Sequence, residues 1–270
     1  TGADSAIFAR NQGTGALSIT TTGTTTGADY GIYARNYSKG TSLTINAATT
    51  TGANNGIRAK NYGSGALSIT TTGDTKGNGT VKDGIFAKNE GTSLTINAST
   101  TTGGRNGIYA KNTGTGDLSI TTTGTTTGNG TDEFNVDGKK YYPAGIFAIN
   151  KGTGALSITT TGTTTGGKNG IYANNSSKGT SLTINAADTT GGRYGIKAVN
   201  KGTGALSITT TGKTTGTDYD GIFASINNAD STGDLTINAA TTTGGQNGIQ
   251  ARNGGTGALS ITTTGDTTGK

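Results

Sequence analysis

Two stretches define the unit that fills this chain: Gly31-Ile-Tyr-Ala-Arg-Asn36 and Gly15-Ala-Leu-Ser-Ile-Thr-Thr-Thr-Gly23. Every copy opens with an isoleucine–x–alanine step, whose isoleucines are Ile7, Ile32, Ile57, Ile85, Ile108, Ile146, Ile171, Ile196, Ile222 and Ile249. Every copy continues with Leu-Ser-Ile or Leu-Thr-Ile, led by Leu17, Leu43, Leu67, Leu94, Leu118, Leu156, Leu182, Leu206, Leu235 and Leu259. Successive isoleucines lie 23 to 38 residues apart, most often 25. A period of this length predicts stacked units that each contact only their neighbours.

The residue pattern within each copy is that of short strands. Gly, Thr, Ser and Asn are poor helix formers, and no segment has apolar residues spaced by three and four. In the first stretch Ile32 and Ala34 share one face, whereas Tyr33 and Arg35 share the other. A third segment reads x-Thr-x-Gly. Its Thr is present in every copy while its flanks vary to Asp or Lys, so we expect this Thr to point inward.

Three short strands per copy, separated by Gly and Asn turns, predict one turn of a three-sided parallel β-helix. Each strand would pair with its counterpart one coil away, so that identical side chains stack in columns about 4.8 Å apart. About ten such coils would form a single all-β domain over residues 1–270, a rod roughly 45 Å long. The Asn that follows the first strand is expected to turn the corner and to form a ladder of side-chain amides. Ile226 replaces this Asn in copy nine, where the corner must be rebuilt.

The composition limits the chemistry available. The chain has 50 Gly, one Pro and no Cys, His, Met or Trp, and 29% of its residues are hydrophobic. Disulfides, thiol catalysis and the usual acyl-transfer triads are therefore absent. Asp218 with Asp220, and Asp132 and Glu133 with Asp137, are the closest carboxylate clusters, and such clusters on turns are usually solvated. We expect no enzyme activity, no cofactor and no metal site. No apolar run reaches the ~20 residues of a membrane helix, and we expect this stretch to be a window of a longer repeat array.

The outward positions of the first strand form two columns. Beside each inward Ile lies an aromatic residue in seven of the ten copies, including Tyr33, Phe86 and Tyr109. Two residues further on, the first five copies each carry a basic residue: Arg10, Arg35, Lys60, Lys88 and Lys111. Residues 1–112 hold ten Lys and Arg against five Asp and Glu, whereas residues 113–270 hold eleven against ten. The excess positive charge therefore lies in the first half of the chain.

Two interpretations of these columns remain open. Outward aromatic residues stabilise neighbouring strands by cross-strand contact, and Lys and Arg keep an exposed sheet soluble. Five like charges at this spacing repel one another, however. A regular line of cations suits a linear polyanion or an acidic protein face. We expect a sulfated glycosaminoglycan or a host cell-surface receptor as the partner. We expect no nucleic acid, because an extracellular location is inferred below.

The largest departure from the repeat lies between Ile108 and Ile146. The extra residues, about 129–144, include Phe-Asn-Val-Asp-Gly-Lys-Lys-Tyr-Tyr. Asp-Gly between strand-forming residues is a strong hairpin signal. We therefore expect a β-hairpin that projects from the rod and carries Lys139, Lys140, Tyr141 and Tyr142 on one arm. Exposed loops on regular scaffolds often carry binding, although an accommodated insertion without a role is an equal alternative.

The third segment suggests a rival function. Pairs such as Thr24 with Thr26 and Thr49 with Thr51 form a Thr-x-Thr array of the kind that ice-binding β-helices use. Asp or Lys interrupts this array in copies three, seven, eight and ten. A flat water-ordering surface should not carry charge that often, so ice binding is the weaker prediction.

The run Gly-Ile-x-Ala-x-Asn, followed by Gly-Thr-Gly-x-Leu-Ser-Ile-Thr-Thr-Thr-Gly, resembles the passenger domains of bacterial autotransporters, the type V secreted proteins. It is most similar to the Bartonella-type passengers, which include a pro-angiogenic factor. The resemblance covers the whole chain and implies a right-handed parallel β-helix, secretion or display at the bacterial surface, and contact with host cells. We therefore expect a monomeric, non-enzymatic adhesin or receptor-activating effector. A structural stalk is the alternative.

Overall fold

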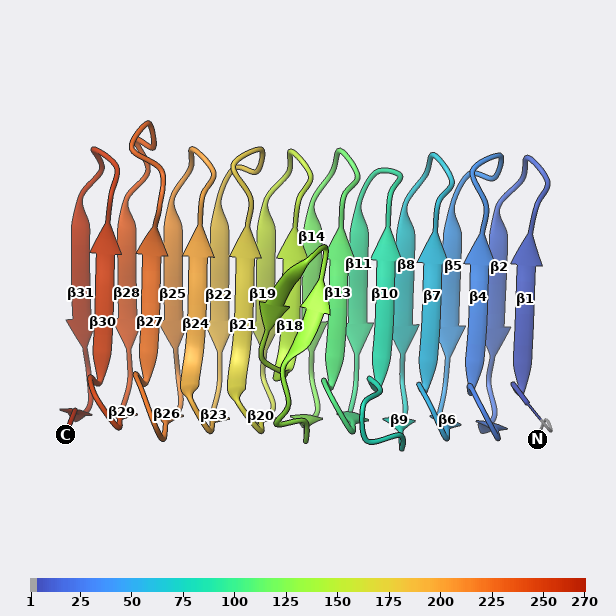
Figure 1. The fold of residues 1–270 in the computed structure, drawn as a ribbon, viewed down its shortest axis with the longest axis horizontal. Helices are drawn as coiled ribbons and strands as arrows, with labels where there is room; N and C mark the ends of the chain where they lie inside the picture. The colour runs from blue at the N-terminus through green and yellow to red at the C-terminus, as the bar shows by residue number, and fades with distance from the viewer. Residues whose placement is uncertain (1–3) are drawn as a thin grey trace.

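The computed structural model describes residues 4–270, and it confirms an all-β solenoid of ten coils with three parallel sheets (Figure 1). The first sheet contains β1 (Ile7–Asn11), β4 (Ile32–Asn36), β7 (Ile57–Asn61), β10 (Ile85–Asn89), β13 (Ile108–Asn112), β18 (Ala144–Asn150), β21 (Asn169–Asn175), β24 (Tyr194–Asn200), β27 (Ile222–Ile226) and β30 (Ile249–Asn253). The second contains β2 (Leu17–Thr21), β5 (Leu43–Ala47), β8 (Leu67–Thr71), β11 (Leu94–Ala98), β14 (Leu118–Thr122), β19 (Leu156–Thr160), β22 (Leu182–Ala186), β25 (Leu206–Thr210), β28 (Leu235–Ala239) and β31 (Leu259–Thr263). The third contains β3 (Thr25–Gly27), β6 (Thr50–Gly52), β9 (Thr75–Gly77), β12 (Thr101–Gly103), β15 (Thr126–Gly128), β20 (Thr164–Gly166), β23 (Thr189–Gly191), β26 (Thr214–Gly216), β29 (Thr242–Gly244) and β32 (Thr267–Thr268).

Each strand pairs in register with its counterpart in the next coil. Ile32, for example, lies opposite Ile7 and Ile57 in the first sheet. The Ile and Ala of the first strands and the Leu and Ile of the second strands form one continuous core, in which most side chains are fully buried. The alternation of two along the sequence therefore predicted the inner faces of these sheets correctly.

The Thr that opens each third strand points inward, as expected. Thr50, Thr75 and Thr101 are fully buried, and their hydroxyl oxygens have no hydrogen-bond partner. The methyl group of this Thr packs against the Gly that precedes the Ile of the first strand. A Cβ built on Gly31 would lie only 2.5 Å from Thr50 Cγ2. This close approach explains why the first strand is so often led by Gly-Ile.

The predicted amide ladder runs along the corner after the first strand. Asn36 Nδ2 donates to Asn61 Oδ1 at 2.8 Å, and Asn61 Nδ2 donates to Asn89 Oδ1 at 2.9 Å. The same bond joins successive members of the column from Asn11 to Asn200. Each Asn also donates to a carbonyl of its own turn, so the same side chain stabilises both the turn and the contact between neighbouring coils. These corner residues do not use the left-handed conformation, because among residues 4–270 the only non-glycine residue with positive φ is Asp137.

Coil nine rebuilds this corner, as the sequence predicted. Ile226 is fully buried in the Asn column. Ser231, also fully buried, donates instead to the carbonyl of Thr203 at 3.0 Å. Asn228 Nδ2 donates to the carbonyl of Gly202 at 3.2 Å. A hydroxyl and a displaced amide thus take over the bonds that the ladder makes elsewhere.

The insertion forms a hairpin, β16 (Phe134–Val136) and β17 (Lys139–Tyr141), joined by Asp137 and Gly138. Both turn residues have positive φ, 49° and 77°, as a type I′ hairpin turn requires. The expectation that this hairpin projects from the rod is wrong. It lies across the outer face of the first sheet, in front of β13 and β18 in Figure 1.

In the part of the chain that the structure describes, no helix is long and apolar enough to cross a membrane.

Candidate binding surface

The three faces of the solenoid differ in chemistry. The second sheet turns Ser or Thr, then Thr or Asn, outward in every coil, as at Ser68 and Thr70. The third sheet turns one residue per strand outward, usually Thr, with Lys76 as a charged exception. The first sheet alone turns aromatic and basic columns outward. The candidate surface therefore lies on the first sheet, the front layer of Figure 1.

The first four coils bring six of the twelve predicted site residues together. Arg10, Arg35, Lys60 and Lys88 lie opposite one another in consecutive strands, and Tyr33 and Phe86 lie in the adjoining column. We call this surface the cation–aromatic stripe and include in it Phe8, Arg10, Tyr33, Arg35, Tyr37, Arg58, Lys60, Tyr62, Phe86 and Lys88. It covers β1, β4, β7 and β10, the blue to cyan strands of Figure 1. The strand registry that the repeat predicted is thus sufficient to align its basic and aromatic columns.

Aromatic rings hold the cations of the stripe in place. The guanidinium of Arg10 lies 4.5 Å from the ring centre of Phe8, and that of Arg35 lies 4.4 Å and 4.9 Å from those of Tyr37 and Tyr62. Arg58 lies 4.8 Å from the ring of Phe86. Cation–π contacts stabilise such pairs by about 0.5–1 kcal/mol at exposed sites. The rings therefore fix the positions of the cations without neutralising them.

Four members of the stripe were not among the predicted site residues: Phe8, Tyr37, Arg58 and Tyr62. Arg58 occupies the aromatic column, where it stacks between coils with aromatic residues. Tyr37 and Tyr62 follow the corner Asn directly and extend over the basic column from its side. Their shared position, immediately after Asn in copies two and three, was the available signal.

Carboxylates are scarce on the stripe. Lys88 forms a salt bridge with Glu90 at 2.7 Å. Among residues 4–270, Arg10, Arg35, Arg58 and Lys60 form none. Burial lowers the pKa of Lys60, and the neighbouring charges of Arg58, Arg35 and Lys88 lower it further. A lowered pKa is expected for a cation that is crowded by like charges and has no anion beside it.

Coil five departs from the prediction, because the hairpin covers it. Tyr109 is 5% exposed and Lys111 is 6% exposed. Phe134 of the hairpin packs edge-on against Phe147 at 5.0 Å, and Tyr141 packs against Phe147 and Tyr172 at 5.3 Å and 5.5 Å. Tyr109, expected on the open surface, is therefore part of a second apolar cluster, and Lys111, expected there too, is buried and pairs with Asp137. The hairpin lies flat because its apolar side chains would otherwise face water.

Two features of the sequence are consistent with this docking. Phe134 and Val136 alternate on one face of the hairpin, and Val136 is 7% exposed in the docked state. In coil six the basic column changes to Ile149, which is buried under the hairpin. An apolar hairpin face opposite an apolar interruption of a charged column was the signal for contact.

The predicted hairpin residues divide between the two sides of that contact. Lys139 and Lys140 are exposed, and Lys140 pairs with Glu133 at 3.2 Å. Tyr141 faces the sheet, as described above. Tyr142 lies against the guanidinium of Arg193, 3.9 Å from its ring centre. The hairpin residues therefore sit next to coils six to eight, apart from the stripe.

Three of the five carboxylates considered for catalysis, Glu133, Asp137 and Asp220, have partners. Asp137 binds Lys111 at 2.6 Å and also Lys151, and these hydrogen bonds lower the pKa of Asp137 to about 2. Asp220 is buried and accepts a hydrogen bond from Asn247 Nδ2 at 2.8 Å. Asp137 therefore stays ionised near neutral pH. Within residues 4–270, no group of three His, Cys, Asp or Glu side chains is arranged to hold a metal ion.

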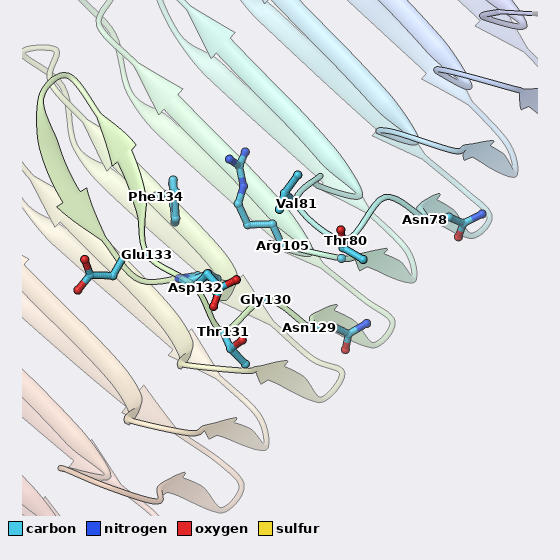
Figure 2. A pocket seen from close by; sticks show the side chains of 12 residues that line it. Asn78, Thr80, Val81, Arg105, Asn129, Gly130, Thr131, Asp132, Glu133 and Phe134 are labelled. Atoms are coloured by element: carbon cyan, nitrogen blue, oxygen red, sulfur yellow. The ribbon is translucent and has the colours of Figure 1, made fainter.

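A cavity of about 440 Å³ lies where the insertion before β10 meets the base of the hairpin. Figure 2 shows Asn78, Thr80 and Val81 on one side and residues 129–134 on the other, with Arg105 between them. Arg105 binds Asp83 at 2.6 Å and lies 4.6 Å from the ring of Phe134. Its charge is therefore already compensated, which distinguishes this cavity from the stripe.

Comparisons with known proteins found no match to this chain, whether among protein-family models, curated proteins or solved structures.

Proposed function

We propose that this chain is a non-enzymatic, extracellular binding rod whose cation–aromatic stripe engages a linear polyanion on host cells. A sulfated glycosaminoglycan is the favoured partner, and an acidic face of a cell-surface receptor has the same chemistry. The observation that carries the proposal is the unpaired ladder of Arg10, Arg35 and Lys60 in consecutive strands. Regularly spaced anions could bind these cations along the rod.

The electrostatics of the stripe favour an anionic partner. Cations in neighbouring strands are about 5 Å apart at their backbones and repel one another. The aromatic contacts compensate this repulsion only in part, since exposed cation–π pairs contribute about 0.5–1 kcal/mol each. A bound polyanion would remove the remaining repulsion and release counterions, which makes binding weaker as salt rises.

The resemblance of the repeat to Bartonella-type autotransporter passengers supports secretion or surface display of this rod. The absence of cysteine agrees with that resemblance. The same resemblance suggests an adhesin or a receptor-activating effector, whether or not it is pro-angiogenic. These proposals rest on the repeat motif, whereas the polyanion proposal rests on the stripe.

A structural stalk is the second candidate. The amide ladder and the continuous core favour it, because both stabilise a rod without specifying a partner. A stalk would need no unpaired cations in a single line, so neutralising them should leave its properties unchanged.

Heparin affinity distinguishes these candidates. In the stripe variant, Arg35, Arg58 and Lys60 are replaced by Gln. In the matched control, Lys76, Lys178 and Lys213, which are exposed elsewhere on the rod, are replaced by Gln. Both variants lose three positive charges. We expect the control to elute from a heparin column near the wild-type salt concentration and the stripe variant to elute much earlier, with a shallower salt dependence.

Equal elution of the two variants would show that net charge alone drives retention and would reject the stripe as the site. A proliferation and adhesion assay on endothelial cells, with the same pair of proteins, then separates the roles. An effector stimulates growth in solution, an adhesin retains cells only when immobilised, and a stalk does neither.

A further inference from the structure

A second cluster of cations and tyrosines lies on the far side of the hairpin from the stripe. The tyrosines of β17 and the segment after it face coils seven and eight, where they enclose a cavity of about 190 Å³. Lys140, Tyr141 and Tyr142 line its hairpin side, and Arg193, Tyr194 and Lys197 line its solenoid side. Sequence reasoning identified the hairpin half of this cluster and missed the other half.

Rings position the two solenoid cations. The guanidinium of Arg193 lies 3.9 Å from the ring centre of Tyr142 and 4.7 Å from that of Tyr219. The Nζ atom of Lys197 lies 4.8 Å from the ring centre of Tyr194. A guanidinium that rests against rings with its flat face keeps N–H donors in its plane. Arg193 is thus held in one orientation with hydrogen-bonding capacity to spare.

Neither solenoid cation is neutralised. Among residues 4–270, Arg193 and Lys197 form no salt bridge. Of the nearby acids, Glu133 pairs with Lys140, whereas Asp220 accepts a hydrogen bond from the neutral amide of Asn247 and keeps its negative charge. Burial lowers the pKa of Lys197, and Arg193 lowers it further whereas Asp220 raises it. The cavity is therefore lined by two cations that form no salt bridge within the described residues, and none of its lining residues is an acid.

We propose that this cavity binds one carboxylate-bearing sugar ring, a uronic acid unit, as a site separate from the stripe. Arg193 and Lys197 would bind the carboxylate, and the planar guanidinium suits its two oxygens. The tyrosines would contact the ring with their faces and its hydroxyls with their phenolic groups. The cavity far exceeds the ~10–15 Å³ of one water and falls short of the 300 Å³ or more of pockets for drug-sized ligands. It therefore fits a single ring.

The site requires the docked hairpin, because Tyr142 comes from the insertion and Arg193 comes from coil eight. Tyr141 anchors the hairpin by its edge contact with Tyr172, 5.5 Å between ring centres. Tyr172 and Lys197 are neighbours in the outward column of the first sheet. The residue that anchors the hairpin and a cation of the cavity therefore lie side by side. The insertion thus creates a site that no repeat unit has by itself.

The test is a titration of the whole chain with methyl β-glucuronide, followed through the Arg side-chain N–H signals in an NMR spectrum. Methyl β-glucoside, which lacks the carboxylate, is the control ligand. We expect the glucuronide to shift the Arg193 signal with saturation and the glucoside to leave it in place. Equal shifts from both sugars, or no saturable shift from the glucuronide, would overturn the proposal.

The variant Arg193→Gln/Lys197→Gln should weaken glucuronide binding at least tenfold. The matched variant Lys178→Gln/Lys201→Gln, with the same charge change in the same coils, should bind like the wild type. Tyr142→Ala keeps Lys140, Arg193 and Lys197, so weaker glucuronide binding by this variant would show that the Tyr142 ring contributes to binding. Unchanged binding by the first variant would overturn the assignment of Arg193 and Lys197, and its thermal unfolding shows whether it is folded.

The stripe variant with Arg35, Arg58 and Lys60 replaced by Gln keeps the two sites distinguishable. It should lose heparin retention and still bind methyl β-glucuronide. Loss of both in that variant would mean that the glucuronide binds the stripe, which would contradict a separate site. Loss of heparin retention with glucuronide binding unchanged would support two separate sites.

Discussion

Both carboxylate oxygens of Asp137 lie 2.6 Å from the Nζ atom of Lys111. Asp137 is at the tip of the hairpin, and Lys111 is the fifth cation of the basic column. Lys151, which follows the corner Asn of coil six, binds the same carboxylate. The Lys111 side chain is 8% exposed, whereas that of Asp137 is 42% exposed. The hairpin thus neutralises the fifth of the five consecutive cations of the basic column and ends the stripe at coil four.

Replacing Asp137 with Asn should loosen the hairpin. Lys111 would keep its charge in a buried position without an anion, which costs about 1–3 kcal/mol for an unsatisfied buried group. The double variant Asp137→Asn/Lys111→Met should recover part of that loss, because a neutral apolar side chain tolerates burial. Chemical unfolding monitored by tyrosine fluorescence measures the free energy of unfolding of both variants. A double variant less stable than Asp137→Asn would contradict the importance of an uncompensated Lys111.

Acid should release the hairpin tip before the solenoid unfolds. Hydrogen bonds from Lys111 and Lys151 lower the pKa of Asp137 to about 2, below the ordinary value of about 3.9. The ionised form is therefore favoured when the hairpin is docked. The contribution of ionised Asp137 to the stability of the docked hairpin is fully present above about pH 4 and is lost as the pH falls toward about 2. The effect should be modest, because Asp137 is partly exposed and solvent screens its charge.

Near-UV circular dichroism of the tyrosines, recorded as the pH is lowered, measures this release. The Asp137→Asn variant is the control and should lack the transition. A transition of the same size in that variant would show that another carboxyl group is responsible.

Removing the hairpin should expose two tyrosines. Deletion of residues 131–143 gives coil six the same spacing as coil seven, so the solenoid should close without the insertion. Burial raises the pKa of Tyr109 and of Tyr172 in the intact protein, and both rings lie under the hairpin. In the intact protein these tyrosines stabilise the fold while neutral, and that contribution is lost as the pH rises above about 10.

Spectrophotometric titration of tyrosine follows this change. In the deletion variant, Tyr109 and Tyr172 should ionise near pH 10 together with the exposed tyrosines. Late ionisation that persists after deletion would mean that the sheet itself, and not the hairpin, shields them. The same variant should keep its heparin retention, because the stripe lies on other coils.

Breaking the amide ladder should destabilise the rod far more than removing an outward amide. Asn89 Nδ2 donates to Asn112 Oδ1 at 2.9 Å and to the carbonyls of Thr92 and Ser93, and Asn89 Oδ1 accepts from Asn61. Asn89→Ala would leave these buried groups unsatisfied, at a cost of about 1–3 kcal/mol. Asn97→Ala, an exposed position in the same coil, is the control and should change stability by less than about 0.5 kcal/mol. Similar urea midpoints for both variants would contradict a stabilising ladder.

Local patterns were sufficient for the solenoid because its units repeat. Alternation placed Ile32 and Ala34 inside, the invariant Thr50 pointed inward, and the corner Asn residues formed their ladder. Registry then followed, since like strands stack on like. The contacts of Arg58 with Phe86 and of Arg35 with Tyr62 required the packing of neighbouring coils, because each joins side chains about one repeat apart.

The sequence by itself determined the three-sided rod, the stacked columns on its first face and the hairpin turn at Asp137 and Gly138. The tertiary structure alone decided which column residues remain open. Whether Lys111 is free or buried depends on where an inserted hairpin comes to rest, and that depends on apolar contacts between Phe134, Tyr141 and rings in several different coils. The apolar hairpin face and the change to Ile149 are separate signals in the sequence, and only the fold brings them together. A repeating pattern, by contrast, specifies the stacking of neighbouring coils at every copy.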